Sequence, residues 1–88
     1  MNQTINDLSR IKWRCRRGTK ELDFLLLNYF NQKYKAAAEE DKRIFLDLLE
    51  LQDPILIEYF AEPKEIQDTG MQRIISEILG STEGYLIK

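Results

Sequence analysis

Apolar residues recur three and four positions apart along most of the chain, which is the period of amphipathic helices rather than of strands. The first such stretch predicts a helix from about Ile5 to Arg17. Thr4 is its expected N-cap, and Gly18 is the expected C′ residue with positive φ. The residues on its apolar face are Leu8, Ile11 and Cys15.

A second stretch predicts a helix from Lys20 to about Tyr34, with Thr19 as its N-cap. Its apolar arc is wide, which indicates a central helix packed on more than one side. The alanine run 36–38 that follows either extends this helix or begins the next one.

The acidic run Glu39–Asp41 suits the first turn of a third helix, because the helix dipole favours anions there. Asp53 followed by Pro54 predicts the N-cap and first residue of a fourth helix, which Pro63 ends. A last helix is expected from about Asp68 to Leu79, stopped by Gly80. Its apolar residues are Met71, Ile74, Ile75, Ile78 and Leu79.

The expected fold is therefore all-α, a compact bundle of five short helices in a single domain over residues 1–80, followed by a flexible tail, 81–88. A chain of 88 residues can bury one modest core.

Charge is unevenly distributed along this chain of net charge −2. Residues 1–20 contain six basic residues and one acidic residue, whereas the remainder contains seven basic and fourteen acidic residues. This asymmetry indicates a basic docking surface on an acidic body. It is equally explained by cations gathering near a helix C-terminus, where the dipole favours them.

Histidine is absent and Cys15 is the only cysteine. These facts exclude histidine-based catalytic triads and the common zinc and haem sites, and no glycine pattern resembles a nucleotide-binding loop. We therefore predict no catalytic, cofactor-binding or metal-binding residues. Cys15 is interpreted as a buried structural thiol, and the lack of a disulfide, signal peptide or membrane span favours the cytoplasm.

Trp13 lies opposite the apolar face of the first helix, among Arg10, Arg14 and Arg17. Tryptophan and arginine dominate the energetics of binding surfaces, so these residues are candidates for partner binding. Alternatively, Trp13 packs against the last helix, and the arginine stems cover its edges.

The turn from Arg16 to Glu21 also has two interpretations. Each residue has a structural role as helix end, glycine cap or helix start. In the functional interpretation, Arg17 forks onto a partner carboxylate or a cofactor phosphate, Glu21 accepts hydrogen bonds, and Gly18 lets another chain approach closely.

The stretch Arg10–Asp23 resembles the FAD assembly factor family that serves succinate dehydrogenase. The family hallmark Arg-Gly-x-x-Glu is matched by Arg17, Gly18 and Glu21. A second similar stretch runs from Asp41 to the Asp53-Pro54 pair, so the resemblance covers roughly residues 10–60.

The resemblance implies a five-helix chaperone that promotes covalent attachment of FAD to the flavoprotein subunit of succinate dehydrogenase, and in bacteria often of fumarate reductase. It implies that Arg17, Gly18 and Glu21 form the functional surface. We expect a monomer that is not an enzyme, does not insert into membranes, binds no nucleic acid and holds no cofactor stably, with FAD handled on the client protein.

Other classes of function compete with this expectation. The resemblance also includes family members described as antitoxin-like partners of a small membrane protein, so an antitoxin-like or regulatory module without a flavoprotein client stays open. A small nucleic-acid-binding domain would use the basic first helix, although a pI near 5.1 argues against it. A free-standing enzyme would need a carboxylate pair in a cleft.

Overall fold

The computed structural model describes the backbone of residues 3–81 and the side chains of residues 8–81. The described backbone is entirely helical apart from its connections and contains no strand. The elements are α1 (Gln3–Arg14), α2 (Lys20–Tyr29), the π-helical turn η1 (Phe30–Tyr34), α3 (Glu39–Leu49), α4 (Asp53–Ala61), the 3-10 turn η2 (Pro63–Glu65) and α5 (Thr69–Ser81). The expected all-α bundle of five helices is confirmed.

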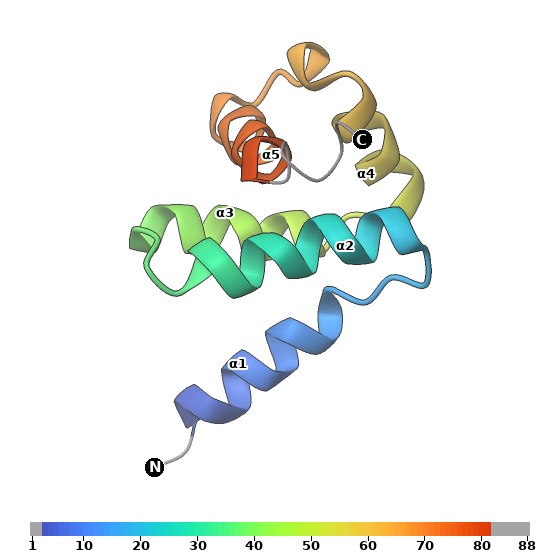
Figure 1. The fold of residues 1–88 in the computed structure, drawn as a ribbon. Helices are drawn as coiled ribbons and strands as arrows, with labels where there is room; N and C mark the ends of the chain where they lie inside the picture. The colour runs from blue at the N-terminus through green and yellow to red at the C-terminus, as the bar shows by residue number, and fades with distance from the viewer. Residues whose placement is uncertain (1–2, 82–88) are drawn as a thin grey trace.

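The helices form three levels around a central pair (Figure 1). α2 and α3 lie side by side and run in opposite directions. α1 lies on one side of this pair, while α4, η2 and α5 lie on the other. α1 and its connection to α2 therefore form a separate ridge at the edge of the molecule.

The core lies between the central pair and α5, and aromatic rings of α2, η1 and α3 fill its middle. The ring centroids of Tyr29 and Phe45 are 4.9 Å apart, and those of Tyr34 and Phe45 are 5.5 Å apart. Burying each such side chain contributes roughly 1.5–3 kcal/mol to folding. The fully buried side chains of the core are Cys15, Leu26, Tyr29, Phe45, Leu48, Leu56, Ile74, Ile75 and Ile78.

The second helix is confirmed in extent, from Lys20 to Tyr34, but its last turn widens into η1. Both Phe30 and Tyr34 are buried there, with ring centroids 5.4 Å apart. Thr19 is its N-cap, as predicted, and accepts a hydrogen bond from the Leu22 amide at 3.4 Å. The alanine run belongs to a turn, since α3 begins at Glu39.

The predicted bounds of the first helix are wrong at both ends. α1 already includes Gln3, so Thr4 is not its N-cap, and the helix ends at Arg14 rather than Arg17. The Cys15 amide still bonds to the helix, but the backbone of Arg17 bonds to a side chain of α2 instead. Because the Arg17 amide donates to the Asp23 carboxylate and not to a carbonyl of α1, the helix does not continue to Arg17.

Asp53 is not the N-cap of α4. The carbonyl of Gln52 accepts from the amides of Ile55 and Leu56 at 3.0 and 3.1 Å, which makes Gln52 the N-cap and Asp53 the first helical residue. The Asp53 carboxylate instead accepts a hydrogen bond from Arg17.

Gly80 does not stop the last helix, which continues to Ser81. Gly18 is the one residue of the described backbone with positive φ. Gly80 therefore does not adopt the left-handed conformation that would end a helix. Asp68 lies just before α5, and its side chain accepts from the Met71 amide at 3.0 Å. The predicted tail, residues 81–88, lies outside the described residues except for Ser81.

Candidate functional site

Residues 15–19, here called the corner, connect α1 to α2 at one end of the molecule (Figure 1). The backbone amides of Arg17 and Gly18 both donate to one carboxylate oxygen of Asp23 in α2, at 3.2 Å for Gly18. Gly18 has the predicted positive φ, +97°, but it is not the C′ residue of α1, because that helix already ends at Arg14. Apart from its two chain neighbours, no atom lies within 4 Å of where a Cβ would stand. The corner therefore has a fixed backbone with open space over its glycine.

Arg17 anchors this corner to the turn between α3 and α4. Its Nε donates to Asp53 Oδ1 at 2.9 Å, and one terminal nitrogen donates to the carbonyl of Leu49 at 2.9 Å. The other terminal nitrogen donates to the carbonyl of Leu51. The Leu49 carbonyl lies at the end of α3, where a helix leaves backbone acceptors without partners and where its dipole favours a cation, and the Leu51 carbonyl lies in the connection to α4.

The guanidinium of Arg17 therefore forms its hydrogen bonds with acceptors of this same chain. Only 14% of its side chain is exposed. Glu21, by contrast, is exposed in the first turn of α2, and Gly18 is exposed beside it. The structure thus places the Arg-Gly-x-x-Glu stretch in the corner and the first turn of α2, with Arg17 facing inward and the other two residues facing solvent.

Trp13 is 71% exposed, so the interpretation that it packs against the last helix is wrong. α5 lies on the far side of the central pair (Figure 1). The Arg16 guanidinium lies 6.0 Å from the centre of the Trp13 ring, within range of a cation–π contact. An exposed indole next to cations is the composition of a binding surface.

Cys15 is fully buried beneath the corner, which confirms its interpretation as a structural thiol. Burial raises the pKa of this thiol to about 12, although the neighbouring Arg17 and Arg14 act in the opposite direction. The thiolate needed for nucleophilic chemistry is therefore disfavoured near neutral pH.

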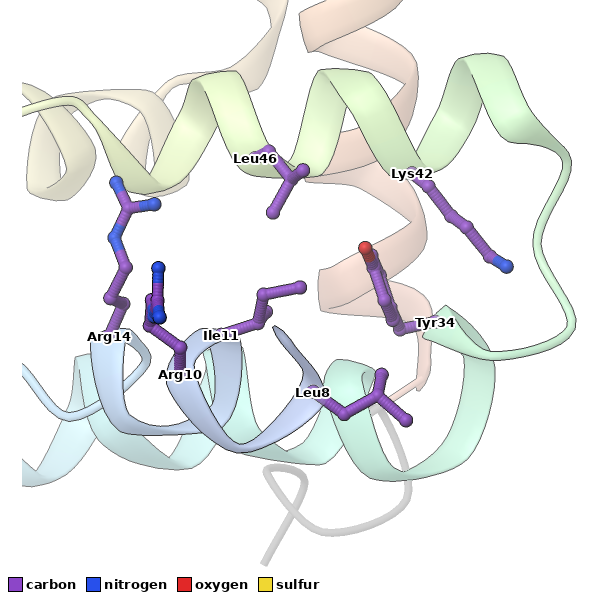
Figure 2. Close-up of a pocket in the computed structure, with 7 residues that line it drawn as sticks. All are labelled: Leu8, Arg10, Ile11, Arg14, Tyr34, Lys42 and Leu46. Carbon is purple, nitrogen blue, oxygen red and sulfur yellow. The ribbon is translucent and has the colours of Figure 1, made fainter. Parts of the chain in front are cut away.

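Arg10 and Arg14 face a groove of about 380 Å³ between α1 and α3, which Figure 2 shows in close-up. Arg14 also forms an ion pair with Glu50 at the end of α3. The residues that line the groove are Leu8, Arg10, Ile11, Arg14, Tyr34, Lys42 and Leu46. The two arginines stand at one end of the groove and Lys42 at the other (Figure 2).

Glu21 lies between two shallow hollows with almost wholly apolar linings. One, of about 270 Å³, extends to Ile57 and Phe60 of α4, and the other, of about 280 Å³, extends to Phe24. Ile57 is 53% exposed and Phe24 is 38% exposed. The sequence analysis did not predict these apolar hollows beside Glu21. The one available signal was Ile57, an apolar residue that lies outside the apolar face of its helix.

Neither a metal site nor a membrane span is found among the described residues. Within the side chains of residues 8–81, no group of three or more acidic residues or cysteines is placed to hold a metal ion. No helix in the described part of the chain has the length and apolar content needed to cross a bilayer.

The family model and the individual relatives that match this chain all point to the same family. The family model described as "Flavinator of succinate dehydrogenase" matches residues 9–82. The chain is 39% identical over 74 residues to a protein of Pectobacterium atrosepticum and 36% identical over 74 residues to one of a Serratia species, with 84% of each chain covered in both cases. It is 34% identical over 76 residues to a protein of Shewanella oneidensis, covering 86% of this chain and 93% of the other. All three relatives carry the name FAD assembly factor SdhE.

Proposed function

Because this chain belongs to the FAD assembly factor family, we propose that it is a chaperone that binds the flavoprotein subunit of succinate dehydrogenase and promotes covalent attachment of FAD to it. The observation that carries the proposal is the family match over residues 9–82, which contain the second half of α1, the corner and the central helix pair. The flavoprotein subunit of fumarate reductase is a second proposed client.

Members of this family are assembly factors rather than enzymes, which confirms the expectation that the chain is not an enzyme. The bond-forming chemistry accordingly belongs to the client and its flavin. What this chain contributes is a surface that holds the client.

We place the client-binding surface at the corner and along the exposed side of α1. Gly18 leaves room for another chain to approach, and the Glu21 carboxylate can accept hydrogen bonds from it. Trp13, Arg10 and Arg14 supply an aromatic anchor and cations on α1. In this proposal Arg17 acts mainly by holding the corner in position.

The size of the hollows described above favours a chain that holds no flavin dinucleotide of its own. The largest has a volume of about 380 Å³ and is open to solvent, near the lower limit of the roughly 300–1,000 Å³ of ligand pockets that enclose their ligand. We therefore propose that FAD is handled on the client, that this chain works as a monomer, and that it does so in the cytoplasm, where its single thiol suits a reducing environment.

The test is covalent flavin fluorescence of the succinate dehydrogenase flavoprotein subunit in cells that carry, lack or mutate this gene. We expect loss of covalent flavin without the gene, and a strong reduction with Glu21→Ala. Glu40→Ala is the matched control, because Glu40 is also an exposed acid in the first turn of a helix, far from the corner. Unchanged flavinylation in cells without the gene would contradict the proposal.

Gly18→Arg tests the corner more directly. We expect it to abolish client binding, with destabilisation on the order of 1 kcal/mol from the positive φ. A purified, folded Gly18→Arg protein that still binds the flavoprotein subunit would contradict the placement of the surface. An unrelated protein recovered as the main partner of the wild-type chain would instead support a regulatory module without a flavoprotein client.

A further inference from the structure

The groove between α1 and α3 combines an apolar floor with positively charged ends. Ile11 of α1 points toward Leu46 of α3, and Leu8 lies below the ring of Tyr34 (Figure 2). These three aliphatic side chains remain partly exposed although they pack against the core. Partly exposed aliphatic side chains in a concave surface are suited to receive apolar side chains from another chain.

Cations stand at both ends of this floor. Arg10 and Arg14 lie at one end, and Lys42 lies at the other, above the ring of Tyr34 with its Nζ 5.7 Å from the ring centre (Figure 2). Among the described residues that line the groove there are three cations and no carboxylate. The local charge is therefore opposite in sign to that of the chain as a whole, which is −2.

The two carboxylates that pair with these cations are both largely exposed to solvent. Glu50 pairs with Arg14, but 70% of the Glu50 side chain is exposed, and Glu39 approaches Lys42 only to 3.9 Å with 95% of its side chain exposed. Exposed pairs of this kind contribute little, so a partner carboxylate can replace either one. The cations remain available to an incoming anion.

We propose that this groove binds a segment of the client flavoprotein in which carboxylates flank one or two apolar side chains. The inference rests on the proposed function and adds the chemistry of the client segment that is recognised. The apolar side chains lie on the floor formed by Leu8, Ile11 and Leu46. The flanking carboxylates pair with the arginines at one end and with Lys42 at the other, which fixes the direction of the segment.

A nucleic-acid strand is a poorer occupant than an acidic peptide. Its phosphates would suit the cations, but its sugars would lie on an aliphatic floor, and the body of the molecule beyond residue 20 is acidic, with seven basic and fourteen acidic residues. A peptide with both apolar and acidic side chains matches both parts of the groove.

The experiment compares Lys42→Glu with Arg43→Glu in binding to the purified flavoprotein subunit. Both variants change the net charge equally and lie next to each other on α3, but Arg43 is exposed outside the groove. We expect Lys42→Glu to weaken binding by about tenfold and to reduce its salt dependence. Arg43→Glu should weaken binding by less than about threefold, as is usual for an exposed charge.

A photo-cross-linking residue at position 46 identifies the occupant directly. We expect the cross-linked client peptide to contain aspartate or glutamate on both sides of an apolar residue. A cross-linked segment without such carboxylates, or no cross-link to the client at all, would overturn the inference. An RNA gel shift that Lys42→Glu abolishes would assign the groove to nucleic acid and overturn it as well.

The outcomes separate this inference from the proposed function. If Gly18→Arg abolishes binding while Lys42→Glu and Arg43→Glu behave alike, the groove is not used and the proposed function stands. If the wild-type chain does not bind the flavoprotein subunit, both are wrong. Should Lys42→Glu fail to fold, the pair Lys42→Gln and Arg43→Gln makes the same comparison by removing each charge.

Discussion

At the scale of single residues, Arg17 connects the corner to the rest of the molecule. Its three donors serve acceptors that are 32, 34 and 36 positions away in the sequence. Two of these acceptors are backbone carbonyls, one at the last residue of α3 and one in the connection that follows it. The side chain of Arg17 therefore joins the end of α3 to the start of α4, and its backbone amide joins both to the first turn of α2 through Asp23.

Replacing Arg17 by Ala should lower the free energy of unfolding by about 2 kcal/mol, because part-buried acceptors lose charged donors. Arg17→Lys should recover only part of this loss, since an ammonium group does not reproduce the fork. Urea unfolding measures both. Arg14→Ala, which breaks an exposed pair, is the control with an expected loss of at most about 1 kcal/mol. Equal losses in the Arg17 and Arg14 variants would refute the anchoring role.

Cys15 should make the fold less stable in alkali. Its pKa is raised by burial from 9.0 to about 12, so the unfolded chain loses the thiol proton at a lower pH than the folded chain does. The stabilisation is complete below pH 9 and falls as pH rises toward 12. Urea unfolding at pH 8 and pH 10 should show a smaller alkaline loss in Cys15→Ala than in the wild type. Burial also raises the pKa of Tyr29 to about 12, so some loss should persist in the variant.

The candidate site residues could be chosen from the sequence, whereas their orientation could not be predicted from it. The Arg-Gly-x-x-Glu stretch and the tryptophan among arginines can both be recognised in the sequence. No local pattern indicates that Arg17 turns inward, because its acceptors are distant and two of them are backbone carbonyls. The apolar hollows beside Glu21 were missed for the same reason, since Ile57 and Phe60 reach them from α4.

At the scale of elements, helical periodicity was enough to predict all five helices, but their ends depend on particular hydrogen bonds. The Thr19 cap was predictable because its partner, the Leu22 amide, is three residues away. The end of α1 was not, because the amides beyond it bond to Asp23 in the next helix. Gly80 misled the prediction, because a glycine after an apolar stripe is usually a helix stop.

Two glycine substitutions test these assignments with opposite signs. Gly80→Ala should stabilise the protein by about 0.5 kcal/mol, because Gly80 lies within α5 and nothing stands within 4 Å of the added Cβ. Gly18→Ala should destabilise it by about 1 kcal/mol, because φ +97° disfavours a side chain even in open space. Thermal unfolding of the two variants measures the contrast. A destabilising Gly80→Ala would mean that α5 ends earlier than described.

At the scale of the whole molecule, α1 is set apart from the other helices. Leu8 and Ile11, the apolar side chains with which it contacts the central pair, are only partly buried, whereas Ile74, Ile75 and Ile78 of α5 are fully buried. Local stability follows the burial of apolar contacts.

Backbone amides of α1 should therefore exchange with deuterium faster than those of α5, as measured by mass spectrometry. Binding of the client should protect α1 more than α5, because the proposed surface and the groove both include α1. Equal protection of the two helices in the free protein would contradict the difference in packing.

The exposure of Trp13 also turns the molecule into its own optical probe. It is the sole indole of the chain, and 71% of it meets water, so its emission should resemble that of free tryptophan in buffer. A docked flavoprotein would shield the ring and shift that emission to shorter wavelength. An incoming isoalloxazine would quench it by energy transfer, so one titration without any attached dye could follow protein docking and flavin arrival as separate events.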